Sequence, residues 1–474
     1  MDSVPTAPER RHVGVATVIA ALALGAFVVF VFWIHHGASR VEQVDEPERA
    51  LAVVVGRTLD LDEGVDRAPA WERRLYTALL GGRADDLAQA IGWYEELEAL
   101  SADPIVDLHL AILEGEAGRL ARLRRRVAEW QRRDGDFPVM AGWLAVAYLG
   151  VPPHGDPGLE AEVASALAPG WFRDRLTLVL ARRSGDAALA KATDAALAAR
   201  GERLRRRLRV FAVAQAAVVA VGALAALGLA RRRGDRARPG AAVFPPPWSG
   251  REGVAVLVRG GALGAVLMTG FLLAPTGNVA LRLALAAAAN LAFLPAILLA
   301  QRRLLRPAGL GLREGFGLAA PGRDLGSLAG ALLAVLALGQ AGQWGIDTVA
   351  RTLDLSSHWT EWFEPDLAWG GRAVVAVTLV DVVMLTPLFE ELLFRGLLFA
   401  TLRRGLGAPG AVVLSAAIFA LAHGYGVLGF ASVFWSACLW AWAYEKTGSL
   451  WPCIASHAVD NLAASLSVLL VLRG

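Results

Sequence analysis

Cysteine is nearly absent from this chain of 474 residues, which contains only Cys438 and Cys453. Both lie in apolar stretches. A disulfide framework and a cysteine-rich zinc site are excluded, because each needs more thiols than the chain provides. No nucleophilic side chain stands out either, since Ser456 would face about 100° away from its neighbour His457 on a helix.

A strong excess of charge of one sign is also lacking, because the formal net charge is only +3 at pH 7. The arginine clusters, for example residues 231–233, lie between apolar blocks. This placement is typical of loops that set the topology of a membrane protein. We therefore expect no nucleic-acid partner.

Long apolar runs, in contrast, are abundant. Hydrophobic residues make up 55% of the chain and the mean hydropathy is +0.46, more apolar than is usual for a soluble protein of this length. The apolar blocks are about twenty residues long, which suits a helix that crosses a bilayer. We predict an all-α fold, a polytopic transmembrane helix bundle of about nine spans in contact with the lipid bilayer. The predicted spans are residues 13–34, 210–230, 254–273, 279–299, 325–338, 374–399, 411–423, 427–444 and 450–470.

A polar segment follows the first span. Residues 13–34 are too many for the apolar region of a signal peptide and no small-residue cleavage site follows them, so we expect an uncleaved anchor. The next segment has ordinary soluble composition, with amphipathic runs at 85–100 and 107–132 of helical period. It is predicted to be one soluble all-α domain between spans one and two. The predicted domains are an anchor helix at 1–36, an extracytoplasmic helical domain at 37–207, a second span with a basic proline-rich linker at 208–251, and a membrane-embedded domain at 252–474.

Lysine and arginine are distributed unevenly among the short loops. The loops after spans two, four, six and eight carry them, and the intervening loops carry few. Because positive loops face the cytoplasm, we expect a cytoplasmic N-terminus and an outer helical domain. Trp and Tyr favour membrane interfaces. We place Trp344, Trp359, Trp362 and Trp369 at the outer face, and Trp440, Trp442, Tyr444 and Trp451 at the inner face. His358 and Glu361 in the outer loop are predicted to be solvated.

Charged side chains inside the predicted spans are costly, so each needs a partner or a chemical role. Glu391 and Arg395 are four residues apart with the acid first, the favourable order for an ion pair on one helix face. Glu390 points about 100° away and lacks this partner. Pro387 is expected to kink the helix near Glu390 and so to admit water. Asp381 in the same span is expected to be structural.

Three further polar residues reach the depth of Glu390 on other spans. At about 1.5 Å per residue, Glu390 and His423 lie at similar depth on antiparallel helices, and His457 lies one turn from Asn461. A Glu and a His can activate a water, while a second His and an Asn can donate hydrogen bonds to an oxyanion; together they suit peptide hydrolysis. The alternative chemistry is a metal site, for which Glu390, His423 and His457 are adequate zinc ligands.

The same residues carry three motifs. Residues 390–396, EELLFRG, resemble the EExxxR motif of the CAAX-protease and bacteriocin-processing family of intramembrane metalloproteases, called CPBP or Abi. Residues 419–423, FALAH, are similar to its FxxxH motif, and residues 457–461, HAVDN, are similar to its HxxxN motif. All three occur in the family's order, on apolar helices, within residues 325–470.

The resemblance implies a role for each matching residue. The implied catalytic residues are Glu390, Glu391, His423, His457 and Asn461, with Arg395 in support. Glu390 and His423 would activate the water, and His457 and Asn461 would line the oxyanion site. The resemblance leaves the cofactor open, with zinc as the candidate.

These motifs predict an intramembrane endopeptidase that acts on membrane-associated protein or peptide substrates. The composition, rich in Ala, Gly and Arg, is typical of a bacterial protein, so we expect a multi-pass protein of the inner (plasma) membrane. The 37–207 domain lies outside the family core and is expected to dock a protein partner. Two alternatives stay open: a catalytically inactive scaffold, immunity or partner-binding protein of the same fold, and a transporter, although the two halves show no repeat symmetry.

Overall fold

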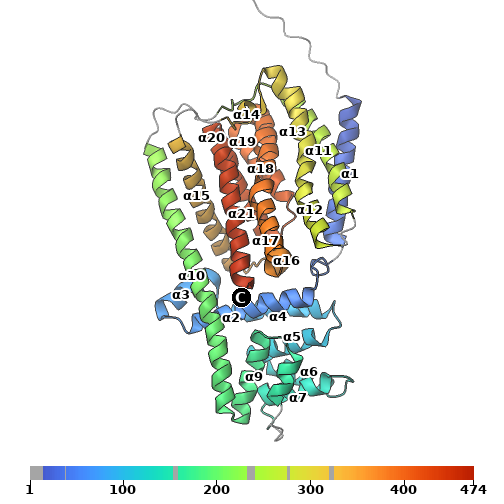
Figure 1. Cartoon of the computed structure of the whole chain (residues 1–474), viewed down its shortest axis with the longest axis vertical. Coiled ribbons are helices and arrows are strands. Elements are labelled where there is room, and N and C mark those ends of the chain that lie inside the picture. Colours follow the sequence, from blue (N-terminus) through green and yellow to red (C-terminus); the bar gives the residue numbers. More distant parts are fainter. Residues whose placement is uncertain are drawn as a thin grey trace, which may run out of the picture. The chain divides into compact units, whose positions relative to one another are not determined.

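The computed structural model describes residues 14–37, 39–152, 159–231, 241–274, 278–319 and 325–473. Over these residues the chain consists of helices and loops without a strand, which confirms the predicted all-α fold (Figure 1). The chain forms two compact units. We call Met1–Gly37, Ala216–Ser357 and Gly371–Ala464 the membrane unit, and Ala38–Gln215, His358–Gly370 and Ser465–Gly474 the polar unit. The polar unit therefore includes two short segments of the predicted membrane-embedded domain.

The membrane unit is built from long apolar helices. Its elements are α1 (Val15–Gly37), the second part of α10 (Ala187–Arg231), α11 (Gly250–Leu272), α12 (Val279–Ala289), η1 (Asn290–Phe293), α13 (Leu294–Ala300), η2 (Gln301–Leu305), η3 (Arg306–Ala308), α14 (Leu312–Gly315), α15 (Leu325–Thr352), α17 (Arg372–Val380), η5 (Asp381–Leu385), α18 (Thr386–Glu391), η6 (Leu392–Phe399), α19 (Ala400–Leu421), α20 (Val427–Thr447) and α21 (Trp451–Leu472).

Eight helical runs in the described part of the chain are long and apolar enough to cross a membrane. One of them, Arg372–Leu421, contains Gly407 with a non-helical φ of 72°. The rings of Phe394 and Phe419 lie 4.8 Å apart on either side of this glycine, whereas a straight helix would separate them by roughly 37 Å. The run therefore turns back near Gly407 and can cross twice, in agreement with the prediction of about nine spans.

Two predicted spans are parts of longer helices. The span predicted at 210–230 is the last half of α10, which has 45 residues and begins in the polar unit. The span predicted at 325–338 continues to Thr352 in α15. Hydropathy ends a predicted span where polar residues appear, although the helix itself continues beyond them.

Small residues allow the helices of the membrane unit to approach closely. A Cβ atom at Gly222 of α10 would lie 2.1 Å from the carbonyl oxygen of Leu333 in α15. A Cβ atom at Gly260 of α11 would lie 2.3 Å from the Cα atom of Ala296 in α13. Such backbone contacts stabilise helix pairs in a bilayer, where burial of apolar surface contributes little.

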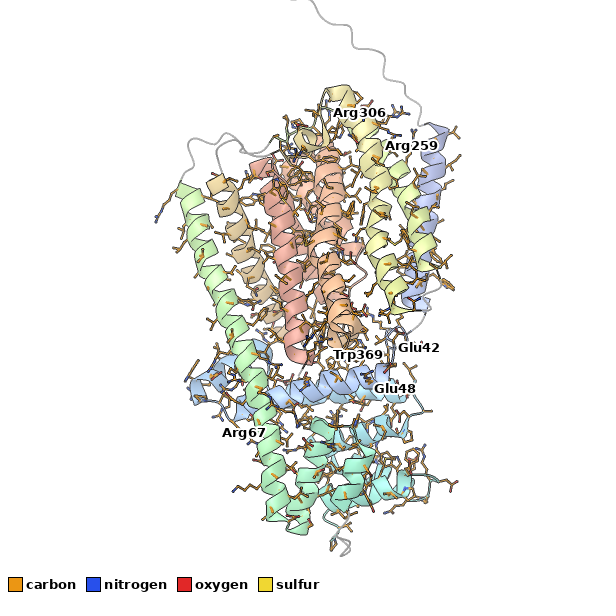
Figure 2. The ribbon with its side chains drawn as sticks, in the orientation of Figure 1. Glu42, Glu48, Arg67, Arg259, Arg306 and Trp369 are labelled. Atoms are coloured by element: carbon orange, nitrogen blue, oxygen red, sulfur yellow. The ribbon has the colours of Figure 1, made fainter. Side chains whose placement is uncertain are left out.

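One arginine joins α11 to the helix beside it, α1. Arg259 donates hydrogen bonds to the Thr17 hydroxyl from Nε at 3.0 Å and from Nη2 at 2.7 Å (Figure 2). A hydroxyl partner lowers the cost of a guanidinium within an apolar helix. The predicted N-terminal anchor is thus packed against the remainder of the membrane unit.

The polar unit consists of shorter helices, in which α4 packs against α2 and α5, α6 against α7, and α9 against α7 and α8. Its elements are α2 (Pro47–Asp66), α3 (Ala70–Leu80), α4 (Arg83–Glu98), α5 (Pro104–Glu116), α6 (Leu120–Trp130), α7 (Phe137–Tyr148), α8 (Leu159–Ala166), α9 (Trp171–Ser184), the first part of α10, η4 (Trp359–Glu361) and α16 (Pro365–Ala368). The predicted run 85–100 corresponds to α4. The predicted run 107–132 is two helices, because Gly118 adopts a left-handed φ of 70° between α5 and α6.

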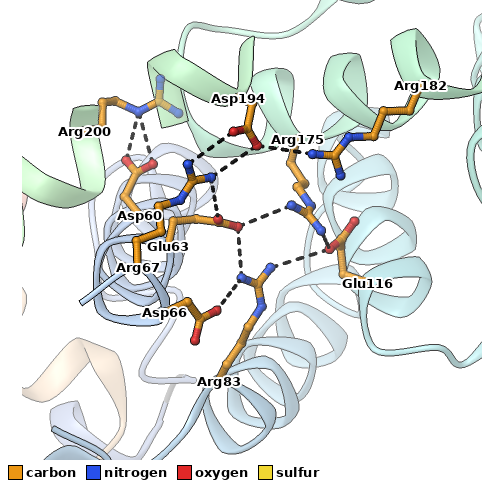
Figure 3. A network of polar contacts seen from close by, with 10 residues as sticks. All are labelled: Asp60, Glu63, Asp66, Arg67, Arg83, Glu116, Arg175, Arg182, Asp194 and Arg200. Carbon is orange, nitrogen blue, oxygen red and sulfur yellow. Dashed lines mark hydrogen bonds and ion pairs between the residues drawn. The ribbon is translucent and has the colours of Figure 1, made fainter. Parts of the chain in front are cut away.

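Arginine–carboxylate pairs connect the helices of the polar unit (Figure 3). Buried Glu63 of α2 accepts hydrogen bonds from Arg83 at 2.9 Å and Arg175 at 3.3 Å. Glu116 of α5 pairs with the same two arginines, at 3.6 Å and 2.7 Å. Asp194 of α10 continues the network toward α9. Each buried carboxylate thus has more than one cationic partner, which offsets the cost of its burial.

Candidate active site

The helix that carries the two glutamates alternates between α and π geometry. The π-helical segments η5 and η6 flank α18, in which Glu390 and Glu391 are the last residues. π-Helical turns leave backbone groups that need other partners and are frequent at functional sites. Asn461 of α21 donates a hydrogen bond to the carbonyl oxygen of Val382, within η5, at 2.9 Å. The amide side chain therefore joins α21 to this helix one turn from His457.

Glu391 lies at the centre of the site and is fully buried, with 0% of its side chain exposed. Its Oε1 atom accepts hydrogen bonds from Arg395 Nη1 at 2.7 Å and from His457 Nδ1 at 2.9 Å. The first contact is the ion pair that the i, i+4 spacing predicts. Because Oε1 of Glu391 is the acceptor for the Arg395 guanidinium, it also takes the proton-bearing nitrogen of the imidazole. We therefore assign the proton of neutral His457 to Nδ1, which leaves Nε2 as an acceptor.

Glu390 faces the other nitrogen of the same imidazole. Its Oε2 atom lies 3.7 Å from His457 Nε2, which is too far for a direct hydrogen bond. A bridging water fits such a separation. Oε2 of Glu390 makes no hydrogen bond within the described residues, although it is buried. Glu390 Oε2 and His457 Nε2 are thus two hydrogen-bond acceptors that face each other.

His423 makes no hydrogen bond or ion pair with Glu390 among the described residues. Its Nδ1 donates a hydrogen bond to the carbonyl oxygen of Phe419 at 2.8 Å, so Nε2 of the neutral ring is again an acceptor. The ring of Phe419 is 4.7 Å from the ring of His423 and 5.9 Å from that of His457. The structure therefore brings Glu390, Glu391, Arg395 and His457 into direct contact, and places His423 across Phe419.

Two aromatic residues that the sequence analysis did not assign to the site enclose it. Trp440 stacks on His457, with ring centres 4.1 Å apart and planes at 16°. The Arg395 guanidinium lies 4.4 Å from the centre of the Phe419 ring and 4.9 Å from that of Trp440. Both aromatic side chains are buried. They fix the imidazole and favour the buried cation through cation–π attraction.

The prediction that Trp440 and Tyr444 of α20 lie at the inner interface together with Trp442 and Trp451 is wrong for the first two residues. Trp440 and Tyr444 are buried, whereas Trp442 and Trp451 are 45% and 48% exposed. Phe419 could have been found from the sequence, because it is the first residue of the FxxxH motif. No feature of the sequence distinguishes Trp440 from its neighbour Trp442.

Residues 372–463 match the family model for type II CAAX prenyl endopeptidase Rce1-like proteins. This segment is Rce1-like. It begins with α17 and includes Glu390, Glu391, His423, His457 and Asn461. The resemblance predicted from the three motifs is confirmed there. No curated protein sequence and no solved structure matches the chain.

The Rce1-like segment and the apolar helical runs make the chain a multi-pass membrane protein with a CAAX-protease-type segment. A protease of this type acts on membrane-associated substrates. Within the segment, Asp381 accepts a hydrogen bond from Asn290 Nδ2 at 2.7 Å. This contact joins η5 to η1 and fits the structural role predicted for Asp381.

Zinc ligation by the Rce1-like segment is chemically reasonable but does not fit the geometry. The tautomers of His423 and His457 leave both Nε2 atoms unprotonated, as a zinc ligand requires. Among the described residues, however, no group of three or more His, Cys, Asp and Glu side chains is arranged to hold a metal ion. Ligation of zinc by Glu390, His423 and His457 stays a prediction.

Proposed function

We propose that the protein is an intramembrane endopeptidase that hydrolyses a peptide bond in a membrane-associated protein or peptide. The observation that carries the proposal is the 3.7 Å separation of Glu390 Oε2 and His457 Nε2, with the imidazole held by Glu391. The match to the Rce1-like family supports the same reaction class.

The attacking water lies between Glu390 and His457. Both facing atoms are acceptors, so the water donates one hydrogen bond to each and directs a lone pair at the substrate carbonyl carbon. Glu390 takes one proton as the C–O bond forms. It then delivers that proton to the amide nitrogen as the C–N bond breaks, and the products are a carboxyl and an amine.

Glu391 and Arg395 act through His457 and do not touch the substrate. The Glu391 carboxylate fixes the ring and its tautomer, as the buried carboxylate does in a catalytic triad. Arg395 holds Glu391 in place from the next turn. These two residues are positioning residues in this mechanism.

His423 and Asn461 complete the proposed site. His423, whose ring lies 4.7 Å from that of Phe419, is proposed to line the site; both protons of the water are already donated to Glu390 and His457, so His423 does not accept from it. Asn461, one turn from His457, is the proposed hydrogen-bond donor to the tetrahedral oxyanion. This assignment moves His457 from the oxyanion role implied by the motifs to the water, because its free nitrogen is an acceptor.

The test is cleavage of a membrane-peptide library by purified protein in detergent. Glu390→Gln keeps the size of the side chain but removes the base, so cleavage should fall at least about a hundredfold. The matched control is Asp460→Asn, the same carboxyl-to-amide change on α21, which should cleave at the wild-type rate. Wild-type cleavage by Glu390→Gln would refute the mechanism.

Metal dependence is decided in the same assay. A chelator should leave cleavage unchanged if Glu390 and the imidazoles activate the water alone. Loss of cleavage with recovery on added Zn²⁺ would instead assign the two Nε2 atoms to a metal. Absence of cleavage by every variant of a folded sample would favour the inactive scaffold.

We also propose an inner (plasma) membrane location with a cytoplasmic N-terminus. The alternation of basic loops supports this orientation, which places the 37–207 domain outside. A cysteine introduced as Ser101→Cys should react with a membrane-impermeant maleimide added to intact cells. Reaction only after lysis would reverse the topology.

The polar unit is proposed to dock an acidic peptide segment of a partner. A cavity of about 680 Å³ between α4, α5 and α6 is lined by Trp130 and Phe137, by four arginines and by the three carboxylates of Glu98, Asp107 and Glu129. Arg125 in this lining makes no ion pair with the described residues. A fluorescent acidic peptide should bind the full-length protein, and Arg125→Ala should weaken that binding.

A further inference from the structure

The segment His358–Gly370, which connects α15 to α17, is an integral part of the polar unit. Trp359 is fully buried, and Phe363, Leu367 and Ala368 are also buried. The prediction that Trp359 lies at the outer membrane interface is therefore wrong. A segment with four buried apolar side chains is held by the hydrophobic effect and cannot move independently of its unit.

Polar contacts hold the two ends of the same segment. At its start, His358 Nε2 lies 3.1 Å from Glu96 Oε2 of α4, and Arg40 donates a hydrogen bond to Glu361 at 2.6 Å. The side chains of His358 and Glu361 are only 17% and 12% exposed. The prediction that both residues are solvated is therefore wrong. At its end, the Arg49 guanidinium lies 4.5 Å from the centre of the Trp369 ring.

Arg473 joins this segment to the end of the last helix. Its guanidinium donates hydrogen bonds to the carbonyl oxygens of Ala368, from Nε at 3.3 Å, and of Gly370, from Nη2. Its own carbonyl oxygen accepts a hydrogen bond from Arg207 Nη1 at 2.8 Å. Gly370 is the last residue of the segment before α17, and Arg473 directly follows α21. One side chain therefore connects the ends of the two helices that carry the proposed site.

The distances along these helices are similar. Glu390 lies 18 residues beyond Arg372, the first residue of α17, or roughly 27 Å along the helix. His457 lies 16 residues before Arg473, or roughly 24 Å. Because backbone hydrogen bonds make a helix stiff along its axis, a displacement at the clamped end is transmitted along the helix toward the site.

We propose that Arg473, through Ala368 and Gly370, is a positioning residue that fixes the axial register of the Glu390 helix against α21. This inference rests on the proposed function. The clamp maintains the gap between Glu390 and His457 that holds the water, although Arg473 touches neither residue.

The test is to remove the clamp and then restore it covalently. Arg473→Ala should lower kcat about tenfold or more, with KM changed little, because misplacement by about 1 Å is costly to a positioned reaction. The double variant Gly370→Cys, Arg473→Cys should recover kcat when oxidised and lose it on reduction. The single variant Arg473→Cys controls for the native cysteines, and Arg132→Ala controls for loss of an exposed arginine.

A second measurement is independent of catalysis. Spin labels at Val377 of α17 and Leu462 of α21 should show a narrow distance distribution in the Glu390→Gln protein. Arg473→Ala should broaden or shift it. A full kcat in Arg473→Ala, or a reduced double variant as active as the oxidised one, would overturn the proposal. If no variant cleaves but Arg473→Ala still broadens the distribution, the clamp stands and the proposed function fails.

Discussion

The two units bury charged groups in opposite ways. In the polar unit, Glu63 and Glu116 each share Arg83 and Arg175, so a carboxylate that loses one arginine keeps another. In the membrane unit, buried Glu391 has a single arginine partner, Arg395. In the polar unit, each of these carboxylates therefore connects helices through more than one arginine. Within the apolar spans, the charges are few and converge on the proposed site.

This difference predicts how each unit responds to the loss of one partner. A redundant network should absorb a substitution, because the remaining ions stay paired. An isolated buried pair should not, because removing one ion leaves an uncompensated charge in an apolar environment. Four substitutions test this contrast, in order of decreasing effect.

The largest effect is expected from Arg395→Met. It leaves the Glu391 carboxylate with only the imidazole as a partner, so unfolding should become easier by about 3–5 kcal/mol and cleavage should be lost. The measurement is thermal unfolding in detergent alongside the cleavage assay. The double variant Arg395→Met, Glu391→Leu should regain most of the stability but none of the activity. Equal stability of the single and double variants would contradict the argument.

Trp440→Leu should have the next largest effect. It removes the ring that stacks on His457 and one face of the cation–π contact to Arg395. We expect kcat to fall about tenfold, because the imidazole gains freedom to rotate. Trp442→Leu, two residues away and 45% exposed, is the control and should retain wild-type kcat. Equal losses in the two variants would show that the stack has no specific role.

Glu63→Gln should have a modest effect although Glu63 is buried. Arg83 keeps Glu116, Arg175 keeps Glu116, and Arg67 keeps Asp194. The expected loss is about 1 kcal/mol of unfolding free energy, with cleavage unchanged. Urea unfolding followed by Trp fluorescence would measure it. A loss as large as that of Arg395→Met would remove the distinction between the units.

The smallest expected effect on stability at neutral pH concerns two neighbouring carboxyls of the polar unit, those of Asp62 and Asp86. Burial, followed by the nearby charge of Asp86, raises the pKa of Asp62 to about 8. Since this folded-state pKa lies above the unfolded value near 3.8, the carboxyl contributes stability at low pH, which is lost as the pH rises through about 8. Asp62→Asn should therefore make unfolding less dependent on pH between 5 and 9. An unchanged pH profile of the unfolding midpoint would refute this assignment.

The parts of the site that could be predicted from the sequence are those that depend on local geometry. The pair Glu391–Arg395 follows from the helical repeat, and the apolar blocks locate the helices that carry the polar residues. The division of the His457 ring between Glu391 and Glu390 depends on the packing of α21 against α18, which no spacing within one helix specifies. The same limit applies to Trp359. The sequence of a loop between spans does not show whether its tryptophan lies at a membrane interface or in the core of another unit.

The order of the helices along the chain has a consequence for biosynthesis. Glu391 and Arg395 lie on one helix, so their charges can neutralise each other as soon as that helix forms, before its neighbours have been made. The imidazole of His457 arrives only with α21, the last helix of the chain in the described residues. In the proposed mechanism, a chain still under synthesis therefore holds the Glu391–Arg395 ion pair but lacks the imidazole that positions the water. Hydrolytic capacity appears only when α21 has been made and closes the site, so a chain that has not yet reached α21 cannot act on the membrane in which it is being assembled.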